Sequence, residues 1–387
     1  MARKIRMGMI GGGPGAFIGE VHRKAARLDG QIELVAGAFS IIPEESTQMG
    51  QELGIDPKRA YLTAADMLKG ELALPADQRV DFVAICTPNF THFSLARDFA
   101  EAGFHIMCEK PMTISLDEAK QLEEVVKRKG TIFGLMHAYT AYPMVKLARD
   151  LVAKGELGTI RKVMVEYAQE WLSQPVERKG NMQASWREDP KKSGAGCLGD
   201  IGTHAANLAE YITGAQIQEV LGEVSTFVEG RPIDDDINVL LHFNKGVRGT
   251  LQACQVAVGE GNDLAIWVYG DKASIEWHQQ DPNYLYFRPY SSPEQLMVRG
   301  SAYIAQKSPA AARASRIPAG HPEGYIEAFA NHYVNFAEQI RAKIEGKKPD
   351  AFALDLPSIT EGVRGMAFID AVLRSGRTGN VWVKMPV

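Results

Sequence analysis

The sequence predicts a two-domain α/β protein, in which an amino-terminal parallel sheet flanked by helices precedes a domain built on a large, mostly antiparallel sheet. Short, continuously apolar runs in the first third are typical of strands buried on both faces. Longer segments of alternating polarity after residue 160 are typical of a sheet with one covered face. At 387 residues the chain is also too long for one ordinary core. We therefore expect one domain over residues 1–138 and a second over 139–387.

The composition argues against several classes of partner. The chain is 45% hydrophobic and 23% charged, as soluble globular proteins are, and its net charge of -4 gives no reason to expect nucleic acid or an anionic membrane. No apolar run approaches the roughly 20 residues of a spanning helix, and a glycine cluster interrupts the basic amino end where a signal peptide would be apolar. The four cysteines are far apart in the sequence and indicate neither a disulfide framework nor a zinc site. We expect a cytoplasmic protein without a metal.

A glycine-rich turn follows the first expected strand, Ile5 to Ile10, and leads into a helix that runs to Leu28. Glycines at such a junction let the backbone turn sharply and approach a pyrophosphate at the positive helix end. The spacing from Gly13 to Gly19, G-x-G-x-x-x-G, is a looser variant of G-x-G-x-x-G. An ordinary turn is the alternative, but the position at the first strand-helix junction favours a dinucleotide. The residues expected at the cofactor here are Gly11, Gly13, Gly15, Phe17 and Ile18.

The end of the second strand, Ile32 to Ala38, bears on which dinucleotide is bound. Enzymes that use NAD normally place an acidic residue here to hold the ribose hydroxyls, whereas this chain has Ser40. The missing acid favours NADP. However, no basic residue follows before Lys58, and Glu44 and Glu45 come first. We expect NAD, with NADP as the alternative and Ser40 near the ribose.

Two polar strand ends dominate the rest of the first domain. The apolar runs from Phe82 to Ile85 and from Ile106 to Cys108 predict neighbouring strands, and parallel strands bind ligands at their carboxyl ends. We therefore expect the two ends to lie side by side. They supply the further cofactor candidates Thr87, Pro88, Asn89, His92, Glu109 and Lys110. The alternative for Lys110 is an ordinary lysine in a surface loop. The alternative for His92, at the start of a helix over 91–102, is a capping or packing role.

Other helices and one strand complete this domain. Helices are expected over Pro43–Leu53 and Ala64–Leu68, the latter starting at Thr63. A capping box, Ser115-x-x-Glu118, begins the next helix, and Thr131 to Leu135 predicts the last strand. The segment from His137 to Pro143 is expected to cross into the second domain.

Strands with alternating polarity characterise the second domain. They are expected over Val163–Tyr167, Ile237–Phe243, Val247–Cys254, Ala265–Tyr269 and Ala273–Trp277. The segment from Gln169 to Lys192 is rich in charge, tryptophan and proline. It is expected to be either a lid over a polar substrate or a solvated loop.

A glycine-rich approach at residues 194–202 leads into a helix that ends near Gly214. On this helix Asp200 and His204 are four residues apart and share one face, and an apolar stripe occupies the other. An amphipathic helix with its polar face in water is the alternative. The Glu-Lys-Pro motif upstream favours a site.

These features together resemble the Gfo/Idh/MocA family of nicotinamide-dependent sugar and cyclitol oxidoreductases. The resemblance rests on the glycine-rich amino end, Thr87-Pro-Asn, Glu109-Lys-Pro, Asp200-x-x-x-His204 and a closing helix near Leu354 to Ser375. It implies a Rossmann domain followed by a domain with a large sheet that often builds oligomer interfaces, so we expect a homo-oligomer, a dimer or a tetramer. The closing helix is expected to pack back on the Rossmann domain.

The resemblance also implies roles for individual residues. Oxidation of a secondary alcohol of a sugar, glycoside or inositol-type cyclitol needs a hydride acceptor and a proton acceptor. We expect His204 to take the proton, Lys110 to hydrogen-bond the reacting oxygen and Asp200 to orient the substrate. Weaker substrate-side candidates are Tyr139, Trp171, Trp186, Arg187 and Tyr325. The alternatives are a glycoside hydrolase that uses NAD transiently and a non-catalytic sensor that binds the dinucleotide.

Overall fold

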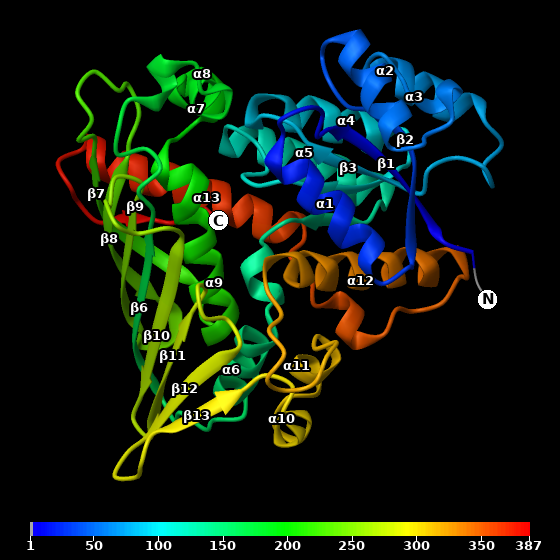
Figure 1. Ribbon diagram of the computed structural model, residues 1–387. Coiled ribbons are helices and arrows are strands. Elements are labelled where there is room, and N and C mark those ends of the chain that lie inside the picture. Colours follow the sequence, from blue (N-terminus) through cyan, green and yellow to red (C-terminus); the bar gives the residue numbers. More distant parts are fainter. Residues whose placement is uncertain (1–2) are drawn as a thin grey trace. The chain divides into compact units, whose positions relative to one another are not determined.

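The computed structural model describes residues 3–387, except for the side chains of residues 182 and 183, and it divides into two compact units (Figure 1). The first unit contains the chain up to Thr113, Asp117–Met136 and Tyr325–Val363. The second unit contains Ile114–Leu116, His137–Gly324 and Arg364–Val387. The chain therefore passes into the second unit at His137, close to the expected boundary. The return of Tyr325–Val363 to the first unit corrects the expected single domain over 139–387.

A five-stranded parallel sheet with the order β2-β1-β3-β4-β5 forms the centre of the first unit. Its strands are β1 (Ile5–Gly11), β2 (Ile32–Ala38), β3 (Phe82–Cys86), β4 (His105–Cys108) and β5 (Phe133–Leu135). Every residue of β3 is buried, as expected for a central strand with both faces covered. The strands that the apolar runs predicted are confirmed, with ends that agree within two residues.

Helices surround this sheet. They are α1 (Phe17–Leu28), α2 (Pro43–Glu52), α3 (Ala64–Ala73), α4 (His92–Glu101), α5 (Leu116–Lys129) and α12 (Tyr325–Ile344). The expected start of α3 is confirmed, because the Thr63 hydroxyl accepts a hydrogen bond from the amide of Asp66 at 3.0 Å.

The helix α12 explains why a late segment belongs to the first unit. It packs along α1 (Figure 1). Its buried aromatic residues Tyr333 and Phe336 contact Phe82 of the sheet. The ring of Phe336 lies 5.1 Å from that of Phe82, edge to face. The resemblance implied that a closing helix near Leu354 to Ser375 packs here, but α13 (Ile359–Arg377) belongs to the first unit only as far as Val363.

A nine-stranded sheet with the order β13-β12-β11-β10-β6-β9-β8-β7-β14 forms the second unit. Its strands are β6 (Ile160–Ala168), β7 (Ile217–Ser225), β8 (Asp236–Phe243), β9 (Arg248–Cys254), β10 (Asp263–Gly270), β11 (Ala273–His278), β12 (Tyr284–Pro289), β13 (Gln295–Val298) and β14 (Val383–Lys384). Neighbours are antiparallel except for the central pair β6 and β9. The expected antiparallel character is confirmed, although the sequence analysis did not anticipate β7 or β12–β14.

Helices cover one face of this sheet. They are α6 (Pro143–Ala153), α9 (Thr203–Thr213) and the later part of α13. The approach of α13 to β7 is close, because the amide of Gly222 donates to the Ser375 hydroxyl at 2.9 Å. Two short helices, α10 (Ala302–Lys307) and α11 (Pro309–Arg313), pack against α6. The strands consequently alternate between buried and exposed residues, as β8 does along its length.

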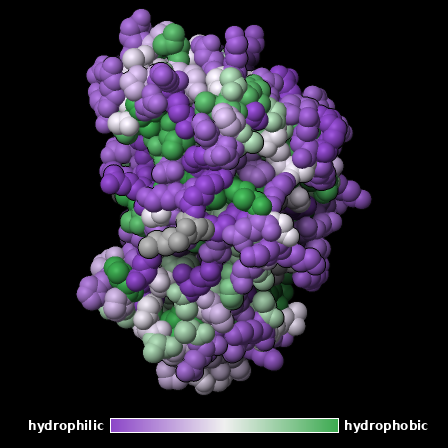
Figure 2. Space-filling model, turned by 90° about the vertical axis from the view of Figure 1, so that its right-hand side faces the viewer, coloured by the Kyte–Doolittle hydropathy of each residue, from purple (hydrophilic) through white to green (hydrophobic). Residues whose placement is uncertain are grey.

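The face of the molecule in Figure 2 is largely hydrophilic, with hydrophobic residues in separate patches. Over residues 3–387, none of the helices combines the length and the apolar composition that a bilayer crossing requires.

Candidate active site

The turn after β1 has a backbone that requires glycine. Gly11, Gly12 and Gly15 have φ angles of +81°, +73° and +74°, which side chains rarely adopt. A Cβ atom on Gly19 would lie 2.2 Å from the Cα atom of Gly12, so α1 can approach the turn only because both residues are glycine. Ala16, the N-cap residue of α1, makes no side-chain hydrogen bond to the first amides of the helix. These amides therefore suit a pyrophosphate, as the sequence predicted.

An acidic residue is present at the end of β2, although the strand itself does not supply it. The Ser40 hydroxyl donates to the Glu45 carboxylate at 2.7 Å, and Glu45 comes from the first turn of α2. A Cβ atom on Gly13 would lie 2.6 Å from the carbonyl oxygen of Phe39, so the glycine turn lies directly beside this strand end. A carboxylate here suits ribose hydroxyls and disfavours a 2′-phosphate. The residues therefore fit NAD.

The two polar strand ends lie side by side, as predicted. The amide of Glu109 donates to the carbonyl of Ile85 at 3.0 Å. The ring of His92 joins the two ends, because its nitrogens lie 2.8 Å from the carbonyl oxygens of Thr87 and Pro111. His92 is fully buried, so the structure places it behind the strand ends and gives it no exposed surface for the predicted contact with the cofactor.

Glu109 is directed into the protein and supports the backbone of Lys110. One carboxylate oxygen lies 2.8 Å from Nε2 of His22, and the other accepts a hydrogen bond from the Lys110 amide at 3.0 Å. Burial alone would raise the pKa of Glu109, but the hydrogen bond and charge of His22 outweigh it and lower the pKa. The other ring nitrogen of His22 lies 2.6 Å from the Tyr333 hydroxyl on α12. The contacts of Glu109 therefore fix the backbone amide of Lys110, and a contact between Glu109 and the cofactor stays a prediction.

In the second unit, His204 lies in a buried aromatic cluster near the start of α9. Its Nδ1 atom is 3.2 Å from Nδ1 of His137, and its ring centre is 4.7 Å from that of Tyr139. The hydroxyl of Tyr139 contacts that of Tyr167 at the end of β6, and the Tyr167 hydroxyl in turn donates to Asn262 at 2.9 Å. The predicted pair of His204 and Tyr139 is therefore brought together, and it is joined by a second histidine.

Asp200 precedes α9 on a π-helical turn, Leu198–Gly202, so it does not share one continuous α-helical face with His204 as expected. Its carboxylate accepts a hydrogen bond from the side-chain amide of Gln255 at 2.8 Å and forms an ion pair with Arg187 at 3.7 Å. The Arg187 guanidinium lies over the ring of Trp186 at 4.3 Å and over that of Trp171 at 5.8 Å. These four predicted residues thus form one cluster.

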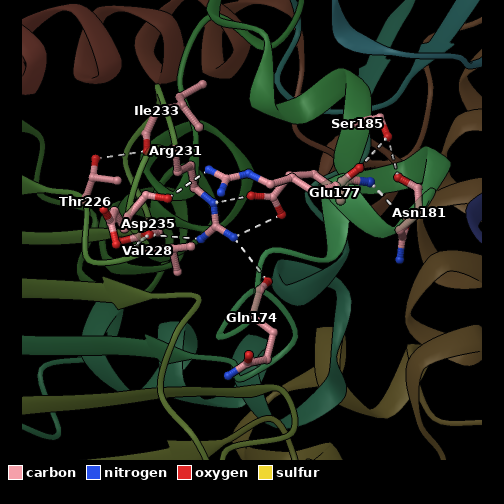
Figure 3. Close-up of polar contacts among 12 residues, drawn as sticks. Gln174, Glu177, Asn181, Ser185, Thr226, Val228, Arg231, Ile233 and Asp235 are labelled. Carbon is pink, nitrogen blue, oxygen red and sulfur yellow. Dashed lines mark hydrogen bonds and ion pairs between the residues drawn. The ribbon is translucent and has the colours of Figure 1, made fainter.

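The segment that carries Trp171, Trp186 and Arg187 has regular structure. It contains a 3₁₀ turn (Val176–Lys179) followed by α7 (Met182–Glu188) and α8 (Pro190–Ser193). Figure 3 shows this segment joined to the connection between β7 and β8 by a buried arginine, Arg231. Of the predicted substrate residues, Tyr325 belongs to the first unit, where it begins α12 and packs on Phe329.

Several residues of these clusters were not predicted. They are His22, Glu45 and Tyr333 in the first unit and His137, Tyr167, Gln255 and Asn262 in the second. A signal was present for two residues of the second group, because Tyr167 is the penultimate residue of β6 and Gln255 follows β9, its parallel neighbour. Polar residues at the ends of adjacent parallel strands indicate a site.

Comparison with known proteins agrees with this architecture. Residues 5–137 match the model of the oxidoreductase family with an NAD-binding Rossmann fold, and residues 145–276 match the GFO/IDH/MocA C-terminal domain. The uncharacterized oxidoreductase YfiI of Bacillus subtilis is 32% identical over 388 residues, which cover 99% of this chain and 98% of that protein. The levoglucosan dehydrogenase of Pseudarthrobacter phenanthrenivorans is 27% identical over 72% of this chain and 74% of its own length.

A solved structure extends the likeness to the complete fold. An inositol dehydrogenase homolog from Azotobacter vinelandii, complexed with NADH and myo-inositol, is 35% identical with a TM-score of 0.91, and the match covers 99% of this chain and 98% of that one. The chain therefore belongs to the Gfo/Idh/MocA family of oxidoreductases, and its first unit is an NAD-binding Rossmann domain.

Proposed function

We propose that this protein is an NAD-dependent dehydrogenase that oxidises a secondary alcohol of a cyclitol or sugar. The observation that carries the proposal is that polar contacts link the histidine cluster to the Asp200 cluster in the second unit. Gln255 donates to Asp200 and to Gln169, and Gln169 donates to Asn262, the partner of Tyr167. Similar proteins are named for inositol and levoglucosan, which are both compact polyols. Carboxylate and imidazole groups suit the hydroxyls of such a ring, and aromatic faces suit its C–H groups.

Bound NAD would supply the hydride acceptor, so the chain itself must receive the hydroxyl proton. His204 is suited to this task, because a neutral imidazole accepts a proton at one ring nitrogen while the other donates. When Nδ1–H of His204 donates to His137 across 3.2 Å, Nε2 of His204 carries the lone pair. We propose this direction, in which Nδ1 of His137 accepts and His204 is a base at Nε2.

Asp200 and Lys110 complete the proposed chemistry. Gln255 and Arg187 both contact Oδ2 of Asp200, and these contacts fix the direction in which the carboxylate would orient a substrate hydroxyl. The backbone amide of Lys110 donates to the Glu109 carboxylate, which holds this part of the chain in place. Its ammonium group would donate to the oxygen on which negative charge develops as the alcohol loses its proton.

A spectrophotometric screen tests this function. The purified protein would be given NAD or NADP with myo-inositol, other cyclitols, free hexoses and glycosides, and NADH or NADPH formation would be followed by absorbance. We expect net NADH from at least one cyclitol or sugar. Cleavage of a glycoside without net NADH would contradict the proposal in favour of a hydrolase, and dinucleotide binding without turnover of any polyol would contradict it in favour of a sensor.

We also propose that the protein is a homo-oligomer, a dimer or a tetramer, assembled through the uncovered face of the nine-stranded sheet. Cross-strand partners form a continuous row on this face. The row consists of Leu221, Leu240, Thr250, Met164, Trp267, Glu276, Tyr286 and Leu296. Most of its members are large and apolar, and Leu240, Met164 and Leu296 are 46%, 37% and 48% exposed. A row that is mostly apolar and partly exposed favours burial against a second copy.

Light scattering in solution tests the assembly. The double variant Met164→Lys and Leu240→Lys should give a smaller species than the wild type, while Leu62→Lys, at an apolar residue of similar exposure in the first unit, should not. A monomeric wild type would contradict the proposed assembly but would not affect the proposed chemistry.

We further propose a cytoplasmic location. All four cysteines are free thiols, and NAD(H) is the intracellular redox carrier.

A further inference from the structure

A buried arginine joins two connections of the second unit (Figure 3). Arg231 donates from Nη1 to Asp235 at 2.9 Å and from Nη2 and Nε to the two oxygens of Glu177 at 3.1 and 3.2 Å. A further contact at 3.3 Å reaches the carbonyl of Gln174. The three charged side chains are at most 2% exposed, so each depends on the others for compensation.

The two carboxylates hold the arginine from different segments. Asp235 accepts hydrogen bonds from the amides of Phe227 at 2.8 Å and Val228 at 3.1 Å, so it belongs firmly to the connection between β7 and β8. Glu177 comes from the segment between β6 and α9. Burial would raise the pKa of Glu177, but the hydrogen bond from Arg231 outweighs it and the pKa is lowered, so the carboxylate stays ionised. The cluster is therefore a clamp between the two segments.

The clamped segment continues directly to the candidate site. The Ser185 hydroxyl, on α7, donates to the carbonyls of Asn181 at 2.8 Å and of Glu177 at 3.4 Å, which fixes α7 to the clamped turn (Figure 3). Two residues later Arg187 meets Asp200 at 3.7 Å. Displacement of Glu177 would therefore be transmitted through α7 to the residue that pairs with Asp200.

We propose that Arg231 is a positioning residue for the substrate side of the active site. By holding Glu177, it keeps α7 where Trp186 and Arg187 can direct the Asp200 carboxylate. The role of Asp200 rests on the proposed function, whereas the clamp itself rests on the contacts around Arg231. The bidentate geometry at Glu177 requires a guanidinium, since a lysine ammonium has one nitrogen and cannot reach both carboxylates in the same way.

The chain offers a matched control. Arg299 is also buried in the second unit and is also paired with a buried carboxylate, Glu323, at 2.6 Å. Its remaining contacts are to Asn283 and to carbonyls of residues 317–321, away from the clamped segment. Loss of Arg299 should therefore destabilise the unit without disturbing α7.

Hydrogen exchange and kinetics on the full chain separate positioning from simple stability. In Arg231→Met, and more mildly in Glu177→Gln, amides of residues 181–188 and 198–203 should exchange at least tenfold faster than in the wild type. The KM for the polyol most active in the screen should rise at least tenfold, while the KM for NAD changes less than twofold. Arg231→Lys should recover part of both effects. Arg299→Met should lower the melting temperature without either effect.

Equal exchange at residues 181–188 in Arg231→Met, Arg299→Met and the wild type would overturn the proposal. So would a KM for the polyol that is unchanged in folded Arg231→Met or Glu177→Gln. If no polyol is turned over by the wild type, the proposed function fails. The exchange rates at 198–203 then still decide whether the clamp positions Asp200.

Discussion

His22 and Glu109 form a buried pair in the first unit, with Nε2 of His22 2.8 Å from a carboxylate oxygen of Glu109. The other oxygen of Glu109 accepts from the amide of Lys110. The pair therefore connects α1 to the backbone of the proposed catalytic lysine, which makes the pair a target for both stability and activity measurements.

The stability of the protein should depend on the ionisation of His22. Burial alone would lower the pKa of His22, but Cys86 and Glu109 outweigh it and raise the pKa to about 10. Because the folded-state pKa lies above the unfolded value of about 6.5, the stabilisation is complete below about pH 6.5 and is lost as the pH rises to about 10. Urea unfolding of the wild type should show the free energy of unfolding declining over this pH range.

His22→Gln should flatten that decline. The control is Tyr333→Phe, which removes the hydroxyl 2.6 Å from Nδ1 but keeps the contact with Glu109, so it should retain most of the slope. A wild type whose unfolding free energy stays constant between pH 6.5 and 10 would show that His22 is neutral in the folded protein.

Lys110→Ala should leave the fold intact and lower turnover by two or more orders of magnitude, roughly what a positioned acid-base group contributes. The control is Lys120→Ala, at an exposed lysine on α5. Circular dichroism and steady-state kinetics check the two variants together. Near-normal turnover in Lys110→Ala would show that Lys110 is an ordinary loop lysine without a catalytic role.

His204→Asn should both slow oxidation and change its pH profile. If His204 takes the proton, oxidation requires the neutral imidazole, so the wild-type rate should rise with pH through a single titration. Asparagine retains a hydrogen-bonding group but cannot titrate, so that limb should disappear. Retention of the limb in His204→Asn would make another group the proton acceptor.

His137→Phe should lower turnover by about tenfold or more, but by less than His204→Asn does. Phenylalanine keeps the aromatic packing and removes the nitrogen 3.2 Å from His204, so the base-competent tautomer is no longer selected. The KM for NAD should not change. His137→Asn, which can still accept a hydrogen bond, should recover part of the loss, and a rate equal to that of His137→Phe would argue against tautomer selection.

Glu45→Gln should reduce the preference for NAD over NADP by about tenfold, measured as the ratio of the two kcat/KM values. The carboxylate held by Ser40 repels a 2′-phosphate, and the amide does not. Glu44→Gln removes the same charge from the neighbouring exposed position and serves as the control. A wild type that prefers NADP a hundredfold would contradict the NAD assignment altogether.

The sequence predicted those features that leave a local pattern. The strands β1, β3 and β4 are largely buried, and such burial favours short apolar runs like Phe82–Cys86. The glycine turn was visible because positive φ angles at Gly11, Gly12 and Gly15 require the same residue type. The start of α3 was visible because Thr63 bonds an amide only three residues away.

Tertiary structure decided the features that join distant segments. His137 and His204 are 67 positions apart, and His22 and Glu109 are 87 apart. Arg231 meets Glu177 across 54 positions. Even Glu45, which supplies the acid expected at the end of β2, comes from the following helix. Such partners are selected by how whole helices and strands pack, and that packing depends on many buried contacts at once. A local pattern therefore determines the elements and their exposed ends, whereas the pairing of their side chains exists only in the folded chain.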